Sequence, residues 1–269
     1  MEVIELKDLD IKKIADSGQA FRITEAGDAW KIIAQDRAVM VRQLTVDRLS
    51  IDCPKEELAF WLNYFDAGTD YPSVRAKADP SDSFLVSACE LGKGIRILRQ
   101  DPWEMLITFI ISQRKNIPAI SASVEKICAA CGELKHADGF DFYAFPKPEA
   151  LAKLTDGELR ECSLGYRAPY IHATAEAVAS GKPDLDAMKE LPDEALLEEL
   201  QKFSGVGPKV ANCVSLFGYH RIAAFPIDVW IRRMIDEEYS GSFPLDKYAG
   251  CAGIIQQYIF YYARKRNDE

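Results

Sequence analysis

The sequence predicts an α+β protein, with an N-terminal antiparallel β-sheet domain in residues 1–97 and an all-helical domain in residues 98–269. Two observations predict this class. Short β-branched or alternating runs, separated by turn residues such as Ala26-Gly27-Asp28, fill the first fifty residues. Farther along, apolar residues recur at helical spacing, and prolines and acids stand where those helices would begin. A chain of 269 residues, 48% of them hydrophobic, is long enough for one or two buried cores.

The sheet domain is expected to consist of strands joined by hairpins. The expected strands lie at residues 3–6, 20–23, 30–33 and 39–42. After them, Pro54 and two following acids open a helix over 54–65. A polar linker at 79–82 and a short helix at 84–91 complete this domain.

The helical domain is expected to begin with a core helix over 103–111, because this run is nearly all apolar. Asp101, Pro102 and Glu104 supply the cap, the proline and the acid that favour a helix start. A polar loop, residues 112–116, separates this helix from the next. Further helices are expected as two between 149 and 180, one at 185–190 and one at 254–264.

Residues 191–233 predict a helix, a tight hairpin and a second helix. Pro192 and two acids open the first helix, whose apolar residues keep helical spacing as far as Phe203. The run Ser204-Gly205-Val206-Gly207-Pro208 then interrupts it, and the second helix starts at once. Gly205 and Gly207 carry no side chains, so their main-chain N–H groups could approach a phosphate closely.

Lys209 and Asp228 are the candidate catalytic residues. Lys209 falls in the first turn of the second helix, where the helix dipole disfavours an ammonium, and a neutral lysine is a nucleophile. Asp228 falls at the start of the following helix, where its carboxylate is stabilised. The hairpin alone also fits a non-catalytic DNA-binding element with both charges solvated, but the order hairpin, lysine, aspartate favours an enzyme.

This stretch resembles the helix–hairpin–helix (HhH-GPD) DNA glycosylases. In their lyase-competent branch, the resemblance implies that Lys209 attacks C1′ of the damaged nucleotide and that Asp228 stabilises the charge growing on the sugar. The resulting Schiff base permits strand cleavage by β-elimination. A related glycosylase for another damaged or mispaired base, and a non-catalytic module that binds damaged DNA, remain the alternatives.

Two further segments resemble the 8-oxoguanine DNA glycosylases: residues 16–22, Asp-Ser-Gly-Gln-Ala-Phe-Arg, and the run from Gly94 to Cys128. The resemblance covers the chain from about Gly18 to Arg264 and implies four residues for base recognition. The Gly18 carbonyl would accept a hydrogen bond from N7–H, which only the oxidised base has. Cys213 would form one wall of the base pocket, Phe260 would stack on the base, and Gln256 would bind its Watson–Crick edge.

The polar loop is a candidate DNA wedge, because a glycosylase must fill the gap left by the extruded base. The family has an Asn-Asn-Asn run where this chain has Arg114, Lys115 and Asn116, and Tyr166 and Arg167 would work at the same place. Two positions depart from the family. Ala119 replaces an arginine that reads the opposite cytosine, so we hypothesise weaker discrimination among opposite bases. Trp230 replaces a histidine near a phosphate, which puts that DNA contact in doubt.

The net charge of −9 would not by itself predict a DNA-binding protein, because phosphate contacts come from lysine and arginine. Acids gather in residues 184–200, however, while basic residues gather elsewhere, as in Arg232-Arg233 and the tail 264–266. The resemblance implies double-stranded DNA containing 8-oxoguanine as the partner, and a local basic face on an acidic protein is compatible with it. We expect a monomer in the cytoplasm, since the N-terminus does not resemble a signal peptide and no apolar run is long enough to span a bilayer.

No cofactor is expected to be required. The seven cysteines form no disulfide framework, and the lone Cys128-Ala-Ala-Cys131 pair is expected to pack at a helix end. Related enzymes with an iron–sulfur cluster carry four cysteines after the aspartate, whereas only Cys251 follows Asp228 here, so such a cluster is excluded. The resemblance implies a monovalent or divalent cation on the hairpin carbonyls of Phe203, Gly205 and Val206 when DNA is bound.

Overall fold

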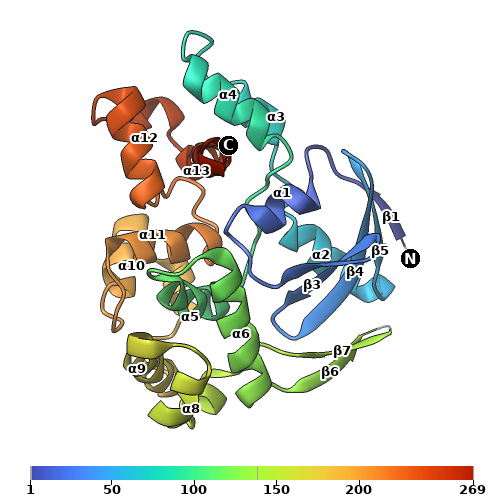
Figure 1. Ribbon diagram of the computed structural model, residues 1–269, viewed down its shortest axis with the longest axis vertical. Coiled ribbons are helices and arrows are strands. Elements are labelled where there is room, and N and C mark those ends of the chain that lie inside the picture. Colours follow the sequence, from blue (N-terminus) through green and yellow to red (C-terminus); the bar gives the residue numbers. More distant parts are fainter. Residues whose placement is uncertain (1, 138, 269) are drawn as a thin grey trace.

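A five-stranded antiparallel sheet forms the N-terminal part of the computed structural model, which describes residues 2–137 and 139–268 (Figure 1). The strand order is β1-β5-β4-β3-β2. The strands are β1 (Glu2–Glu5), β2 (Ile23–Ala26), β3 (Ala29–Ala34), β4 (Arg37–Thr45) and β5 (Arg48–Asp52). Gly27, in the β2–β3 turn, has φ +67°, a conformation that glycine adopts without steric cost.

Helices make up most of the rest of the chain (Figure 1). They are α1 (Ile11–Asp16), α2 (Leu58–Tyr64), α3 (Tyr71–Arg75), α4 (Ser83–Gly92), α5 (Pro102–Ser112), α6 (Ile117–Cys131), α7 (Pro148–Leu151), α8 (Asp156–Glu161), α9 (Ala168–Ala179), α10 (Asp193–Leu200), α11 (Pro208–Phe217), α12 (Val229–Tyr239) and α13 (Ala252–Asp268). The predicted fold class is therefore confirmed. No helix in the described ranges is long and apolar enough to cross a bilayer.

The two main hydrophobic cores do not follow the order of the chain. One core joins the sheet to α1 and α2, with Ile14 and Trp61 fully buried in it. The other includes apolar residues of α3 and α4 together with those of the later helices. Helix α13 packs against α4 and α12, which places the last helix against a segment that precedes residue 97 in the sequence (Figure 1).

Several elements differ from the sequence expectations. Helix α1 was not predicted, although Asp10 caps it by accepting a hydrogen bond from the Lys13 amide at 3.0 Å. The helical region also carries an unpredicted two-stranded ribbon, β6 (Leu134–Ala137) and β7 (Phe140–Tyr143). Phe142 of this ribbon packs on Ile33 and Ala38 of the sheet. Tertiary packing thus stabilises a ribbon that would be marginal alone.

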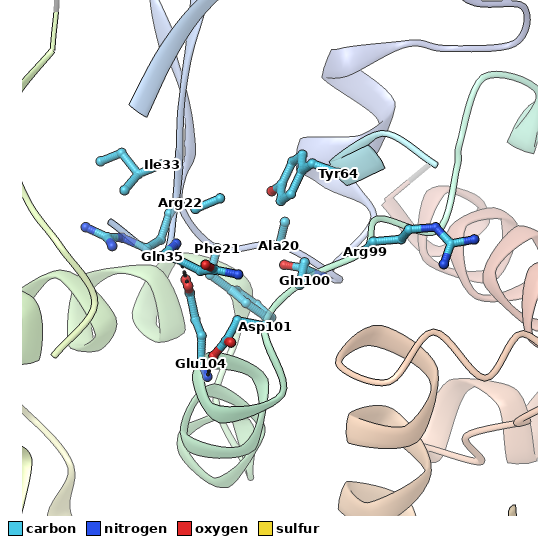
Figure 2. A pocket seen from close by; sticks show the side chains of 11 residues that line it. Ala20, Phe21, Arg22, Ile33, Gln35, Tyr64, Arg99, Gln100, Asp101 and Glu104 are labelled. Carbon is cyan, nitrogen blue, oxygen red and sulfur yellow. Dashed lines mark hydrogen bonds between the residues drawn. The ribbon is translucent and has the colours of Figure 1, made fainter. Parts of the chain in front are cut away.

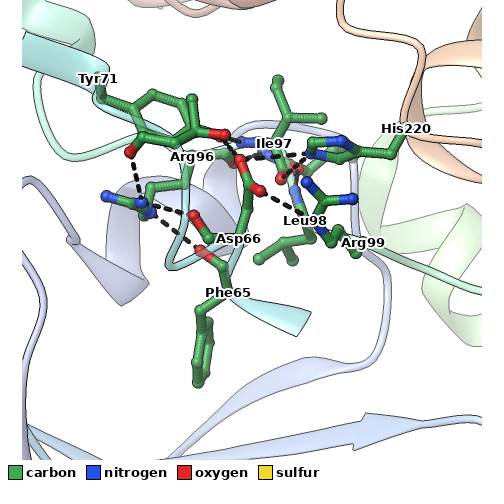
Figure 3. A network of polar contacts seen from close by, with 10 residues as sticks. Phe65, Asp66, Tyr71, Arg96, Ile97, Leu98, Arg99 and His220 are labelled. Atoms are coloured by element: carbon green, nitrogen blue, oxygen red, sulfur yellow. Dashed lines mark hydrogen bonds and ion pairs between the residues drawn. The ribbon is translucent and has the colours of Figure 1, made fainter. Parts of the chain in front are cut away.

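A buried polar network centred on Asp66 joins the sheet region to the loop after α11 (Figure 3). The Asp66 carboxylate accepts a hydrogen bond from the Tyr71 hydroxyl at 2.8 Å and one from Arg99 Nε at 2.9 Å. His220 Nε2 lies 3.3 Å from the same carboxylate. Burial opposes ionisation, but the hydrogen bond and charge of His220, helped by Tyr71, lower the pKa of Asp66 to about 2.

A second buried carboxylate, Glu104, lies where α5 meets the sheet (Figure 2). Its Oε2 accepts a hydrogen bond from the Gln35 amide at 3.0 Å. Burial raises the pKa of Glu104 to about 7, although the positive charge of Arg22 opposes this shift. Arg22 itself is held by Glu125 of α6, with 2.7 Å between Nε and Oε1.

Candidate active site

The hairpin between α10 and α11 has the predicted form. Gly205 has φ +77°, and an added Cβ there would lie 2.5 Å from Tyr170 Cδ2, so both the conformation and the space require glycine. Gly207 is different, because its φ is −94° and a Cβ would meet only open space. It precedes Pro208 as the N-cap of α11, and no side chain accepts from the first amides of that helix. Those N–H groups are available to an anion.

Lys209, in the first turn of α11, is half-buried above an aromatic stack. Its Nζ lies 5.5 Å from the centroid of the Phe109 ring. Phe217 stacks on the same ring at 5.4 Å, and Phe21 meets it edge-on at 6.0 Å. The ammonium therefore rests against a ring face, a contact worth about 0.5–1 kcal/mol at a partly exposed site.

Asp228 is the N-cap of α12, and its Oδ1 accepts a hydrogen bond from the Ile231 amide at 2.9 Å. Burial raises the pKa of this carboxyl, while the Ile231 amide and the charge of Lys209 act in the opposite direction. Asp228 is thus largely removed from water, and the positive charge of Lys209, the candidate nucleophile, partly compensates its negative charge.

One cavity of about 1250 Å³ brings these two residues together. The loop after α5 contributes Arg114 and Lys115 to the same cavity, and α12 contributes Trp230. The lining residues are Ser112, Gln113, Arg114, Lys115, Pro208, Lys209, Asn212, Phe225, Ile227, Asp228, Val229, Trp230, Arg232, Arg233, Asp236 and Glu237. The ends of three helices that are separate in the sequence therefore meet at one site.

The four residues predicted to recognise the base do not line this cavity but lie on the elements behind it. Gln256 of α13 donates from Nε2 to the Pro226 carbonyl at 3.1 Å, just ahead of Asp228. Its Oε1 is buried and has no hydrogen-bond partner among the described residues. Since a carbonyl can only accept, this contact fixes which end of the amide is the nitrogen. An acceptor is therefore left free for a ligand.

Gly18, Phe260 and Cys213 also lie close to the expected site. Gly18 has φ +74°, and a Cβ there would lie 3.3 Å from Phe260 Cε1 and 3.2 Å from Ile117 Cδ1. Glycine therefore allows the backbone to approach the phenylalanine ring closely. Cys213 is buried one helical turn after Lys209. Burial raises the pKa of its thiol, which favours the neutral thiol over the thiolate.

The predicted DNA-binding residues fall into two groups. Arg114 is exposed, Tyr166 is 48% exposed, and Asn116 caps α6 by accepting from the Ala119 amide at 3.0 Å. Lys115 and Arg167, by contrast, are turned toward the protein. Arg167 is only 5% exposed and donates to the main-chain carbonyls of Leu164 and Gln113.

Sequence reasoning missed two residues of this site. Gln113 links the loop to the hairpin, because its Nε2 donates to the carbonyls of Ile110 and Gly205, both at 3.1 Å. Its polarity at the end of an apolar helix was the only available signal. Phe109 resembled any other core residue of α5, and only the fold reveals that its ring faces Lys209.

The hairpin carbonyls predicted to hold a cation already take part in hydrogen bonds. The Phe203 carbonyl accepts from the Val206 amide at 3.1 Å, and the Gly205 carbonyl accepts from Gln113. Each carbonyl has a second lone pair, so these bonds leave room for a cation. Elsewhere in the described ranges, no cluster of three or more His, Cys, Asp or Glu side chains could hold a metal ion.

Comparison with known proteins defines the class. Residues 107–242 match the model of the HhH-GPD superfamily base excision DNA repair proteins. Residues 3–106 match the model of the 8-oxoguanine DNA glycosylase N-terminal domain. The chain therefore belongs to the HhH-GPD superfamily, and within it to the branch that carries this N-terminal domain.

Relatives agree with this assignment. A probable N-glycosylase/DNA lyase of Methanothermobacter thermautotrophicus is 30% identical over 80% of this chain and 78% of its own length. The N-glycosylase/DNA lyase of Saccharomyces cerevisiae is 38% identical over 55% of this chain and 42% of its own length. The 8-oxoguanine glycosylase/lyase of Clostridium acetobutylicum, solved with double-stranded DNA containing cytosine opposite 8-oxoG, has a TM-score of 0.89 at 34% identity. That alignment covers 99% of both chains.

Proposed function

We propose that this protein is an 8-oxoguanine DNA glycosylase with AP-lyase activity. The observation that carries the proposal is the shared cavity of Lys209 and Asp228, placed at the N-terminal ends of α11 and α12. The Lys209 nitrogen attacks C1′ as the bond from C1′ to the base breaks, and the base leaves with a proton. The anionic Asp228 stabilises the positive charge that develops on the sugar.

The lyase step follows from the same residues. Loss of a proton and opening of the sugar ring convert the C1′ adduct into a Schiff base with Lys209. A base then removes a C2′ proton, and the 3′ phosphate leaves by β-elimination. In this proposal the amides at the start of α11 and the cationic rim, which includes Arg114 and Arg232, bind the DNA backbone.

Base recognition is assigned to the residues behind the cavity. The buried, unpartnered Gln256 Oε1 supports an acceptor role toward the N–H groups on the Watson–Crick edge of the base. The Gly18 carbonyl accepts from N7–H, while Phe260 and Cys213 hold the two faces of the base. Guanine would place an N7 lone pair against the Gly18 carbonyl, so this contact discriminates against the undamaged base.

The test is borohydride trapping on a duplex carrying one 8-oxoguanine opposite cytosine, beside the undamaged duplex. We expect a covalent adduct with the lesion alone, and none with Lys209→Gln. Lys202→Gln is the matched control, because this exposed lysine pairs with Glu199 and does not line the cavity. Trapping on a different damaged base would support the related glycosylase. Tight lesion binding without any adduct would support the non-catalytic module.

The same experiment, repeated with each base opposite the lesion, tests the hypothesis attached to Ala119. Alanine cannot donate to cytosine, so we expect excision opposite C, A, G and T to differ by less than the 10-fold or more that one bidentate contact supplies. Ala119→Arg is expected to raise the preference for cytosine. Strict preference for cytosine in the unaltered protein contradicts the hypothesis.

The proposal also includes a monomer that acts on DNA in the cytoplasm, requires no cofactor and has no iron–sulfur cluster. A monovalent or divalent cation on the carbonyls of Phe203, Gly205 and Val206 would bind at the phosphate-facing hairpin. Measuring duplex affinity in potassium chloride and in tetramethylammonium chloride at equal ionic strength tests this cation. Equal affinities would argue against it.

A further inference from the structure

The loop between α5 and α6 holds Arg114 in an unusual conformation. Arg114 has φ +52°, in the left-handed region that side chains other than glycine rarely adopt. Such a conformation persists only where neighbouring contacts enforce it. Its neighbours Gln113 and Lys115, together with Arg167, make those contacts.

Arg167 holds the loop from the helical side. Its guanidinium donates to the main-chain carbonyl of Gln113, and also to that of Leu164 at 3.2 Å. The same group lies 4.3 Å from the centre of the half-exposed Tyr166 ring. The positive charge of Arg167 is thus buried against the Gln113 carbonyl, directly before Arg114, and fixes the direction of the main chain there.

Lys115 holds the loop from the other side. Its Nζ donates to the hydroxyl of Ser123, which is only 1% exposed, and to the Ser163 carbonyl at 2.6 Å. Ser163 is itself left-handed, with φ +63°, and also accepts from Lys126 at 2.7 Å. Burial lowers the pKa of Lys115, and the charges of Arg167 and Lys126 lower it further. Two donors of the ammonium are therefore engaged within the protein.

Gln113 completes the arrangement by joining the loop to the hairpin. Its side chain bridges the end of α5 and the Gly205 carbonyl. The loop is thus attached through Gln113 and Lys115 to the turn at residues 163–167, and through the Gln113 side chain to the hairpin that precedes Lys209. Arg114, between these attachments, is exposed at the rim of the cavity.

We propose that Lys115, Arg167 and Gln113 are positioning residues that hold Arg114 preformed as the side chain that fills the gap left by the extruded base. This inference rests on the proposed function for the role of Arg114, but the roles of Lys115 and Arg167 go beyond it. A preformed wedge loses less conformational freedom on binding than a loop that must order itself. Lys115 and Arg167 then act through Arg114 and not as phosphate ligands.

A cluster of basic residues would also attract a DNA phosphate. The first experiment therefore uses the salt dependence of DNA affinity to separate phosphate binding from positioning of Arg114. Duplexes carrying a stable abasic-site analogue measure affinity without cleavage. A phosphate ligand contributes about 0.9 to the slope of log affinity against log salt. We expect Lys115→Met to leave this slope unchanged, and Arg232→Met, which removes an exposed arginine of the cavity, to reduce it. A reduction of about 0.9 with Lys115→Met overturns the proposal.

The second experiment is a double-mutant cycle measured by single-turnover excision. We expect Lys115→Met to slow excision about 10-fold, and to have less than a 2-fold effect once Arg114→Ala is present, because residues that act through one another are not additive. An equal effect in both backgrounds overturns the proposal. If Lys115→Met does not fold, Ser123→Ala removes one acceptor instead and is expected to show the same non-additivity.

Failure of the two proposals is distinguishable. If the protein does not excise 8-oxoguanine, the proposed function fails, yet the salt slopes still decide whether Lys115 binds phosphate. If excision occurs and the effects of Lys115→Met and Arg114→Ala are additive, only the positioning role fails.

Discussion

Two carboxylates, Asp66 and Asp228, each lie near a basic residue. Their environments nevertheless shift their pKa values in opposite directions. The pKa of Asp66 is lowered to about 2, despite burial, by hydrogen bonds and charge from neighbours that include His220 and Tyr71. The pKa of Asp228 is raised by burial, which the Ile231 amide and the Lys209 charge only partly oppose.

The difference lies in the kind of donor that each carboxylate receives. Asp66 has partners on both oxygens, from Tyr71, Arg99 and His220, so its negative charge is fully compensated (Figure 3). Asp228 accepts from the Ile231 amide at 2.9 Å, is also helped by the Trp230 amide and its own amide, and faces an open cavity. A satisfied carboxylate stabilises the fold, whereas an incompletely satisfied one retains the capacity to stabilise a charge that appears only during reaction.

The largest predicted effect removes the catalytic charge. Asp228→Asn is expected to slow excision by about 10²–10³-fold, because the developing positive charge on the sugar loses its counter-charge. Asparagine caps helices as well as aspartate does, so the change in stability is expected to stay below about 1 kcal/mol. Single-turnover excision and thermal melting measure the two effects. A large loss of stability with little loss of excision rate would mean that Asp228 stabilises the fold, as Asp66 is expected to do, and would contradict the prediction.

The opposite pattern is expected for Asp66→Asn. Breaking this buried network leaves its cationic partners uncompensated and is expected to cost about 3 kcal/mol of unfolding free energy, with the excision rate of the folded enzyme preserved. Because the folded-state pKa of Asp66 lies below the ordinary 3.8, its stabilisation is present above pH 4 and is lost as pH falls toward 2. Urea unfolding between pH 2 and 6 should show the two proteins converge at the acid end. A constant difference would exclude this charge effect.

The sequence predicted the catalytic pair and not the buried network because their determinants differ. Lys209 and Asp228 stand at helix starts that local residues define, so spacing and capping are sufficient to place them. Asp66, Arg99 and His220 are distant in the sequence, and only the packing of the sheet region against the loop after α11 brings them together. The direction in which a side chain points can also depend on residues that are distant in the sequence.

Arg167 and the β6–β7 ribbon illustrate that limit. The sequence could not show that the Arg167 side chain turns inward, because its direction depends on a carbonyl 54 residues earlier in the chain. The ribbon at residues 134–143 has weak alternation of its own and is held by Phe142 against the sheet. Gly205, by contrast, was recognisable from sequence, since its left-handed backbone is a local requirement of the hairpin.

Glu104 offers an intermediate case, a buried carboxylate with neither a full set of donors nor a reaction to assist (Figure 2). Its pKa, raised by burial from the ordinary 4.5 to about 7, means that stability falls as pH rises from about 4.5 to 7. Glu104→Gln keeps an acceptor for the Gln35 amide and should be about 3 kcal/mol more stable than the unaltered protein at pH 8. Near pH 4 the two should match. Equal stability at both pH values contradicts this prediction.

The smallest predicted effect concerns the basic residue near each carboxylate, Arg99 for Asp66 and Lys209 for Asp228. Arg99 is fixed on Asp66 by a directional hydrogen bond, whereas Lys209 is placed by the face of Phe109 without one. Phe109→Leu is expected to slow borohydride trapping about threefold to fivefold, since the lysine side chain loses a contact worth about 0.5–1 kcal/mol. Phe217→Leu changes the other ring of the same stack, is the matched control and should trap at the unaltered rate. Equal slowing in both variants would mean that the stack acts through packing alone, and the aromatic face would then have no separate role in placing the nucleophile.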